Sequence, residues 1–182
     1  LPLLRKRFPE AALTFLANPG TESVLFGNPH LEEISVMPRD GWIRPLGFMQ
    51  KLRQAGFDGV VDLTDGDRSA FLTYWTGAPV RLGFNRENRW RGKLYTQVLP
   101  LAYGSMHMVD YHAQALRALG INDPIGEPEL YLRPEDQDQG DQVLTSLQIG
   151  HAPLVLLHPS ARYVDKAWPP ERFAALADWL AG

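Results

Sequence analysis

Apolar residues follow two different periods along this chain of 182 residues. Several short segments are almost continuously apolar, which is typical of buried strands: residues 12–17, 34–37, 60–64, 80–84, 95–99 and 154–157. Other segments repeat an apolar residue every three or four positions, as one face of a helix does: residues 46–55, 67–76, 108–119 and 173–180. The alternation predicts an α/β fold with a mainly parallel sheet built from βαβ units.

Glycine and proline mark the ends of these elements. Gly120 closes the strongest helical pattern, as a C-terminal glycine commonly does. Residues 122–134 are rich in Pro and Gly, and the segment that follows them is polar and partly helical. We therefore expect one domain over residues 1–134, a connecting segment over residues 135–150, and the start of a second domain over residues 151–182.

Composition excludes several classes of protein. The chain is 45% hydrophobic, which suffices for a buried core, and its net charge of −3 with no long basic stripe argues against general nucleic-acid binding. It contains no cysteine, which excludes disulfides, thiolate zinc sites and a cysteine nucleophile, and fits a reducing compartment. No apolar run approaches the roughly 20 residues of a membrane span.

The loop after the apolar run at residues 154–157 carries the densest candidate chemistry. In α/β proteins such a loop lies at the carboxyl end of a strand, where ligands bind, and cations beside a helix start suit a phosphate. We therefore expect Lys166 to contact a phosphate, with Ser160 and the amides near Ala161 donating to the same oxygens. The alternatives are an ordinary surface lysine, a simple turn at Ser160, and an Arg162 tied to an acidic neighbour.

Polar and charged side chains also gather at the end of the expected strand at residues 60–64. They suit the lining of a substrate cleft: Asp62, Thr64, Asp65, Asp67 and Arg68. Asp65 and Asp67 equally suit the cap of the following helix. A metal site is a third interpretation, which the lack of a neighbouring phosphate motif disfavours.

A basic loop surrounds Trp90, and we expect it to be exposed, mobile and able to bind an anion. Its cations fall within thirteen residues: Arg81, Arg86, Arg89, Arg91 and Lys93. The alternative is a flexible loop that is merely solvated. His107 begins the next helix, where it either reaches the same cleft or caps the helix.

The order of these segments resembles that of the ADP-heptose:lipopolysaccharide heptosyltransferases, an inverting glycosyltransferase family. The similar motifs cover most of the chain in the same order: Arg7-Phe8-Pro9, Asn18-Pro19-Gly20-Thr21-Glu22, Asn28-Pro29, Val60-Val61-Asp62-Leu63-Thr64, Asp67-Arg68-Ser69-Ala70, Arg81-Leu82-Gly83-Phe84, His107-Met108-Val109-Asp110-Tyr111, Leu119-Gly120-Ile121, His158-Pro159-Ser160-Ala161-Arg162 and Lys166-Ala167-Trp168-Pro169. The last two motifs are the sharpest match. Those around Asp62 and Ser160 look most like the heptosyltransferase III branch.

The resemblance implies a GT-B type α/β fold: a Rossmann-like, parallel-sheet N-terminal domain that binds the acceptor, plus a second Rossmann-like domain that binds the nucleotide sugar. Residues 1–134 would form the acceptor side, and residues 151–182 the first strand, loop and helix of the donor domain. The family's first strand, with the Asp expected to act as general base, would precede Leu1. No catalytic residue is therefore assigned within the chain, and the chain by itself is expected to be inactive.

The implied reaction moves heptose from ADP-L-glycero-D-manno-heptose to the inner core of lipopolysaccharide, with no metal or other cofactor. The implied donor-binding residues are Ser160, Ala161, Arg162 and Lys166. Those implied for the anionic acceptor are Thr64, Asp67, Arg68, Arg86, Arg89 and His107. The implied location is the cytoplasm of a Gram-negative cell, with peripheral association with the inner membrane and no nucleic-acid partner.

Two other functions stay open from the sequence. One is a different GT-B enzyme that uses a sugar nucleotide, such as an N-acetylglucosaminyltransferase. The other is a non-catalytic binding module with a flavodoxin-like fold.

Overall fold

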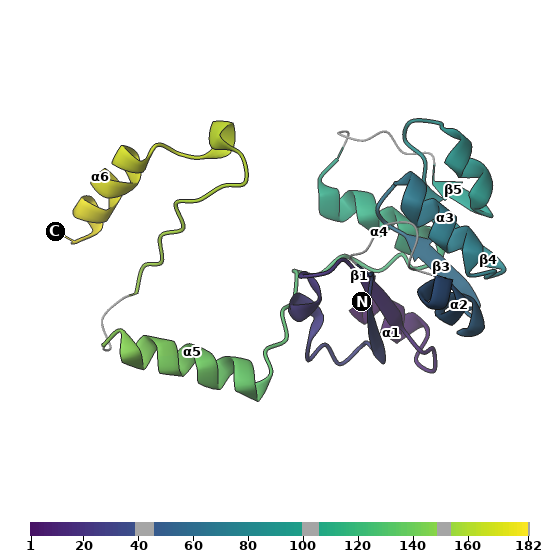
Figure 1. Ribbon diagram of the computed structural model, residues 1–182, viewed down its shortest axis with the longest axis horizontal. Coiled ribbons are helices and arrows are strands. Elements are labelled where there is room, and N and C mark those ends of the chain that lie inside the picture. Colours follow the sequence, from purple (N-terminus) through teal and green to yellow (C-terminus); the bar gives the residue numbers. More distant parts are fainter. Residues whose placement is uncertain (39–45, 100–105, 149–153, 182) are drawn as a thin grey trace. The chain divides into compact units, whose positions relative to one another are not determined.

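The computed structural model describes residues 1–38, 46–99, 106–148 and 154–181 (Figure 1). The chain separates into two compact units, Leu1–Arg133 and Pro134–Gly182. The domain assignment over residues 1–134, 135–150 and 151–182 stays a prediction, and each unit is described by itself.

The first unit contains two parallel sheets. Their strands are β1 (Thr14–Ala17) and β2 (Glu33–Val36) in one sheet, and β3 (Gly59–Asp62), β4 (Val80–Phe84) and β5 (Gln97–Leu99) in the other. Every pairing is parallel, as the alternation of apolar segments predicts. The five expected strands before residue 100 are confirmed, with ends shifted by a few residues.

Helices connect the strands of this unit. They are α1 (Pro2–Arg7), the 3₁₀ turn η1 (Glu22–Leu25), α2 (Leu46–Gln54), α3 (Asp67–Trp75), the 3₁₀ turn η2 (Trp90–Leu94) and α4 (Met108–Ala118). The helical periods at residues 46–55, 67–76 and 108–119 are therefore confirmed. Gly120 has φ of 78°, the left-handed conformation that ends α4.

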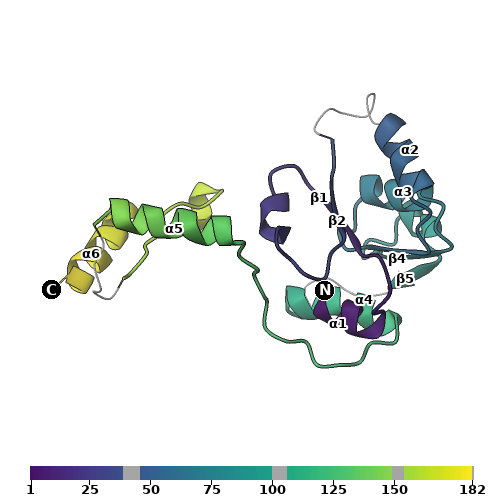
Figure 2. The same cartoon turned by 90° about the horizontal axis from the view of Figure 1, so that it is seen from below.

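The two faces of the sheet β3–β4–β5 are covered by different helices. Figure 2 shows α2 and α3 on one side of β4 and β5, and α4 on the opposite side. On the α4 side the core consists of Leu82, Phe84, Leu99, Tyr111 and Ala115. The rings of Phe84 and Tyr111 stack with centroids 4.3 Å apart. Full burial of a side chain such as Phe84 stabilises the fold by about 1.5–3 kcal/mol.

The second unit contains α5 (Pro134–Ser146), the 3₁₀ turn η3 (Val164–Lys166) and α6 (Pro170–Ala181). The strand expected at residues 154–157 is wrong, since this segment forms no ladder. A strand needs a neighbour to satisfy its N–H and C=O groups, and the described part of this unit contains no strand. Leu156 is consequently 88% exposed.

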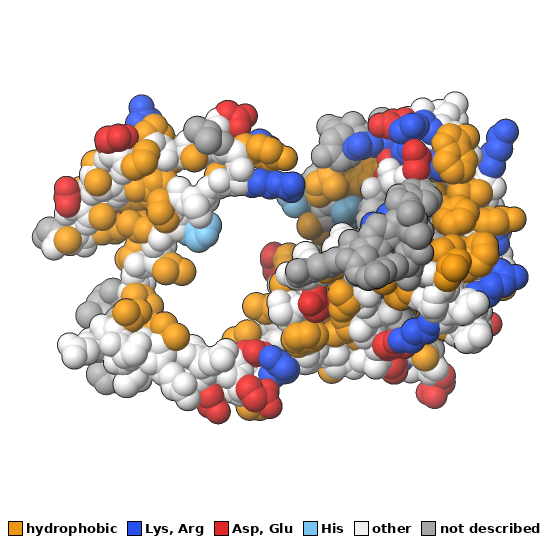
Figure 3. Space-filling model, viewed as in Figure 1, with side chains coloured by type: hydrophobic (Ala, Val, Ile, Leu, Met, Phe, Trp, Pro, Cys, Tyr) orange, Lys and Arg blue, Asp and Glu red, His pale blue; other side chains and the backbone are white. Residues whose placement is uncertain are grey.

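Apolar side chains are open to solvent along the second unit, including α6 (Figure 3). The helical period at residues 173–180 also predicts a buried face on α6, and this prediction is wrong. Phe173, Leu176 and Ala177 are half-buried, and Leu180 is 41% exposed. Phe173 packs edge-on against Trp168, with centroids 5.0 Å apart. Within the described ranges, no helix is long and apolar enough to cross a bilayer.

Candidate functional site

The candidate site of the first unit lies where β3 and β4 end. Asp62 is the last residue of β3, and Asp67 is the first residue of α3. The basic loop and η2 follow β4. Because the carboxyl ends of parallel strands meet at one edge of a sheet, the acidic cluster and the basic loop come together there.

Asp62 is buried and accepts three hydrogen bonds. Its Oδ1 accepts from the Thr64 amide at 2.9 Å and from the Thr64 hydroxyl at 2.7 Å. Its Oδ2 accepts from the Tyr95 hydroxyl at 2.7 Å. Burial, followed by the charge of Asp62, raises the pKa of Tyr95, so the phenol keeps its proton. Thr64, an implied acceptor contact, is thus exposed but fixed by Asp62.

Gly83 makes room for this arrangement. It pairs with Asp62 in the sheet, so both residues face the same side. A Cβ on Gly83 would lie 2.3 Å from Cζ of Tyr95, which leaves no space for any side chain. The glycine therefore lets the Tyr95 ring lie flat on β4 with its hydroxyl aimed at Asp62.

Arg91 is the second buried centre of the site. Its side chain is only 2% exposed and contacts three carboxylates. Nη2 lies 2.9 Å from Oδ1 of Asp65, and Nη1 lies 3.1 Å from Oδ1 of Asp67 and 3.4 Å from Oε2 of Glu87. Burial alone would lower the pKa of Arg91, but hydrogen bonds to Asp65 and Asp67 raise it above its usual value. The guanidinium is therefore a permanent buried cation.

The expectation that Arg91 lies on an exposed loop is wrong. The local density of positive charge favours solvent, but Asp65, Asp67 and Glu87 neutralise the buried guanidinium. Asp65 and Asp67 therefore form ion pairs with Arg91 and do not cap α3. The N-cap position of α3 is Gly66 instead.

Two further arginines form the outer part of the same group. Arg86 Nε lies 3.3 Å from Oδ2 of Asp65, and the Arg86 side chain is 38% exposed. Arg89 lies 3.5 Å from Asp67 and 3.3 Å from Glu87, and its side chain is 51% exposed. Both implied acceptor residues are therefore accessible from solvent while paired with carboxylates.

The Asn85 side chain holds the loop that carries these arginines. Its amide donates to the Arg89 carbonyl at 2.9 Å and accepts from the Arg89 amide at 3.0 Å. A Cβ on Gly92 would lie 2.2 Å from Nδ2 of Asn85, so only glycine fits beneath this clip. The loop therefore has a defined shape set by Asn85 and Gly92.

The remaining candidates of the first unit are more peripheral. Arg68 is exposed on the first turn of α3, and Lys93 is exposed on η2. His107 is the N-cap of α4, where its Nδ1 accepts from the Val109 amide at 3.3 Å. Arg81 donates to the carbonyl of Leu94 at 2.9 Å and therefore ties η2 to β4.

The candidate donor loop of the second unit gathers two cations on one aromatic ring. The Lys166 amine lies 5.3 Å and the Arg162 guanidinium 5.5 Å from the centroid of Tyr163. Ser160 forms a hydrogen bond with Nε2 of His158 at 3.3 Å, and Ala161 follows it in the exposed loop. Arg162 therefore packs on Tyr163. The alternative, in which it pairs with an acidic neighbour, is not what the structure shows for this side chain. Such a loop offers two cations and a hydroxyl to an anion.

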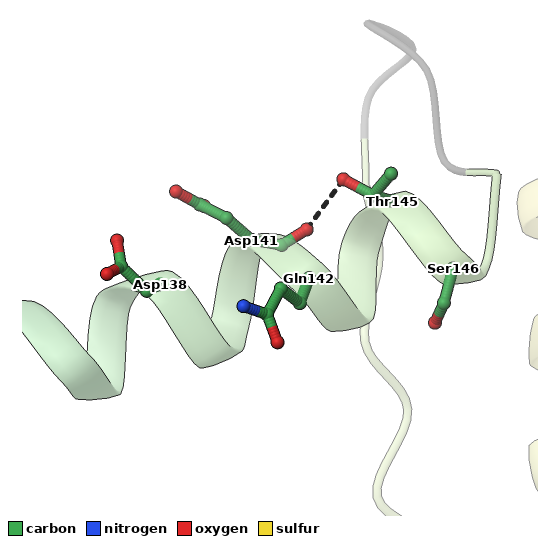
Figure 4. A pocket seen from close by; sticks show the side chains of 5 residues that line it. All are labelled: Asp138, Asp141, Gln142, Thr145 and Ser146. Carbon is green, nitrogen blue, oxygen red and sulfur yellow. Dashed lines mark hydrogen bonds between the residues drawn. The ribbon is translucent and has the colours of Figure 1, made fainter.

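A shallow cavity of about 470 Å³ lies along α5 (Figure 4). Its lining comes from one helix: Asp138, Asp141, Gln142, Thr145 and Ser146. The Thr145 hydroxyl donates to the carbonyl of Asp141 at 2.8 Å. Two carboxylates and no cation make this surface unsuitable for a diphosphate, so it is not the donor site.

The sequence patterns did not point to Tyr95, to Glu87, or to the hydrogen bonds between the Asn85 side chain and the backbone of Arg89. Gly83 carried a usable signal, because glycine inside a strand often marks a close approach of another group. Glu87 carried none, because its role depends on the buried position of Arg91.

Residues 46–181 match the family model described as glycosyltransferase family 9 (heptosyltransferase). Among curated proteins, the chain is 24% identical over 187 residues to lipopolysaccharide heptosyltransferase 3 of Escherichia coli, covering 97% of the chain and 54% of that protein. It is 22% identical over 181 residues to lipopolysaccharide core heptosyltransferase OpsX of Haemophilus influenzae, covering 96% and 50%. The chain thus spans about half the length of the curated relatives that it matches.

Two solved structures share the fold. A glycosyl transferase family 9 protein from Veillonella parvula superposes with a TM-score of 0.86 at 21% identity, covering 98% of this chain and 53% of that one. The E. coli ADP-heptose lps heptosyltransferase II superposes with a TM-score of 0.73 at 23% identity, covering 99% and 55%. These matches confirm the expected α/β fold class of the GT-B type.

Proposed function

The chain belongs to glycosyltransferase family 9, and on that premise we propose that the intact protein transfers heptose from ADP-L-glycero-D-manno-heptose to the inner core of lipopolysaccharide. The observation that carries the proposal is the family match over residues 46–181, which includes both candidate loops. Two curated relatives are named lipopolysaccharide heptosyltransferase 3, which favours the heptosyltransferase III branch.

The donor side of the proposal rests on the loop around Tyr163. A single in-line displacement at the anomeric carbon leaves ADP, whose diphosphate gains negative charge in the transition state. Lys166 and Arg162 pack against the ring of Tyr163, and Ser160 adds a hydroxyl donor. Cations positioned beside the leaving group stabilise its developing charge more than they stabilise the ground state. We assign leaving-group stabilisation to Lys166.

The acceptor side rests on Arg86 and Arg89. Both are partly exposed beside the end of β3, and the lipopolysaccharide inner core is anionic. Thr64, Asp67, Arg68 and His107 stay proposed contacts on the same side. A base would remove the acceptor hydroxyl proton, and no residue of this chain is assigned that role. We place the reaction in the cytoplasm, at the inner face of the membrane, and without a metal.

The test is steady-state kinetics of the intact protein with donor and acceptor varied. Lys166→Ala should lower kcat on the order of 10²-fold and raise the KM for ADP-heptose, while the acceptor KM stays nearly constant. Lys51→Ala is the matched control, because it removes an exposed lysine of α2 whose surface ion pair has little worth. Wild-type kcat and donor KM in a folded Lys166→Ala protein would contradict the donor-site assignment.

Titration with ADP and UDP separates this proposal from other sugar-nucleotide enzymes of the same fold. A heptosyltransferase should bind ADP more tightly than UDP. Preference for UDP would point to a different donor and would remove heptose transfer from the proposal.

A further inference from the structure

Arginines and carboxylates at the end of β3 form a group of ion pairs, here called the arginine–carboxylate cluster. Its members are Asp65, Asp67, Glu87, Arg86, Arg89 and Arg91. Every carboxylate contacts Arg91 and one of the two outer arginines. The formal charges of the guanidinium groups and the carboxylates cancel, so the cluster is balanced before any ligand binds.

The inner and outer parts of the cluster differ in burial. Arg91 and Asp65 are 2% and 7% exposed, whereas Arg86, Arg89 and Glu87 are 38%, 51% and 48% exposed. A buried ion cannot leave its partner without a large desolvation penalty. A partly exposed arginine can change partner at little cost, because water screens the pair. The inner pair is therefore fixed and the outer arginines are exchangeable.

We propose that Arg91 is a positioning residue for an anion exchange. Arg86 and Arg89 turn from their carboxylates to bind oxyanions of the acceptor, and Arg91 meanwhile keeps its contacts with Asp65, Asp67 and Glu87 and so holds them in place. The ligand chemistry is a carboxylate or a phosphate. The inference rests on the proposed function, since it describes how the acceptor side recognises its substrate. In this exchange Asp67 also acts through Arg89, for which it competes with the acceptor.

The exchange predicts that one substitution strengthens acceptor binding. Glu87→Gln removes a competitor for Arg89, at 3.3 Å, while Arg91 keeps its bonds to Asp65 and Asp67. The acceptor KM should fall about two- to fivefold, the effect of losing one exposed ion pair. Glu33→Gln is the matched control, an exposed carboxylate paired with Lys51 outside the cluster, and it should leave the acceptor KM unchanged.

Arg91→Lys tests the positioning role itself. Lysine keeps the charge but lacks the planar, five-donor guanidinium that reaches Asp65, Asp67 and Glu87 from one buried position. The acceptor KM should rise on the order of tenfold, with donor KM and kcat near wild type, a split that general destabilisation would not produce. An unchanged or raised acceptor KM in Glu87→Gln, or a wild-type acceptor KM in folded Arg91→Lys, would overturn the proposal. If Arg91→Lys does not fold, Glu87→Gln decides.

A binding readout separates this proposal from heptose transfer. If the wild-type protein transfers no heptose, the proposed function fails, and the exchange is then tested by arginine Nε–H resonances in NMR titrations with inorganic phosphate and with acetate. Shifts of Arg86 and Arg89 with either anion, at a constant Arg91 resonance, support the exchange. No shift of Arg86 and Arg89 with either anion, or any shift of Arg91, overturns it. Comparison of the two anions identifies which oxyanion the outer arginines bind.

Discussion

Substitution of Gly83 by alanine should break the buried hydrogen bond between Tyr95 and Asp62. The new Cβ would lie 2.3 Å from Cζ of Tyr95, whereas carbon atoms pack at about 3.5–4.0 Å. The ring must therefore move by more than about 1 Å, which takes its hydroxyl out of reach of Oδ2 of Asp62.

The expected cost follows from these two events. A buried acceptor left without its donor costs about 1–3 kcal/mol, and overpacking adds about 1–3 kcal/mol. The total, about 2–6 kcal/mol, is a large part of the 5–15 kcal/mol that typically stabilises a domain. Gly59→Ala is the control, because its Cβ would meet Val80 at an ordinary 3.8 Å.

Urea unfolding followed by circular dichroism measures both variants. Because the clash requires the ring, Gly83→Ala should cost less than about 1 kcal/mol in a Tyr95→Ala background. A Gly83→Ala protein within about 0.5 kcal/mol of wild type, or equal costs in both backgrounds, would refute this reasoning.

Three further outcomes are expected. Burial, followed by the charge of Asp62, raises the pKa of Tyr95 in the folded state. The stability that this shift contributes is complete below the ordinary tyrosine pKa of about 10 and is lost as the pH rises above it. The gap in unfolding free energy between wild type and Tyr95→Phe should therefore narrow as pH rises above about 10, and a constant gap would contradict the shift. His107→Ala should cost about 0.5–2 kcal/mol in urea unfolding, with His107→Asn close to wild type, because the cap accepts from the Val109 amide; equal losses would contradict capping. EDTA should leave the transferase rate unchanged, and a loss restored by added Mg²⁺ would show a metal requirement.

The fold was predictable wherever the sequence pattern is local. Residues 80–84 are largely apolar and form β4 with the expected ends. The helical period of residues 108–119 and the glycine that follows it fix α4 in the same way. Residues 154–157 have an equally apolar pattern but form no strand, because a strand also depends on a neighbour that a local pattern does not contain.

The candidate site was predictable in its location but not in its contacts. Because the carboxyl ends of parallel strands meet at one edge of a sheet, Asp67 and Arg89 are expected to lie close together. In the structure their side chains are 3.5 Å apart. The burial of Arg91 was not predictable, because its partners Asp65 and Asp67 lie 26 and 24 residues away. Charge density alone favours solvent, and only the folded arrangement shows that carboxylates pair with the buried guanidinium.

Direct observation of heptose transfer tests the central claim. The intact protein is incubated with ADP-heptose and heptose-acceptor lipopolysaccharide, and both released ADP and the mass of the acceptor are followed. We expect one added heptose for each ADP released, and both signals to appear on the order of 10²-fold more slowly in Lys166→Ala. Release of ADP without a heavier acceptor, or turnover with a UDP-sugar only, would contradict the assignment of heptose transfer to this protein.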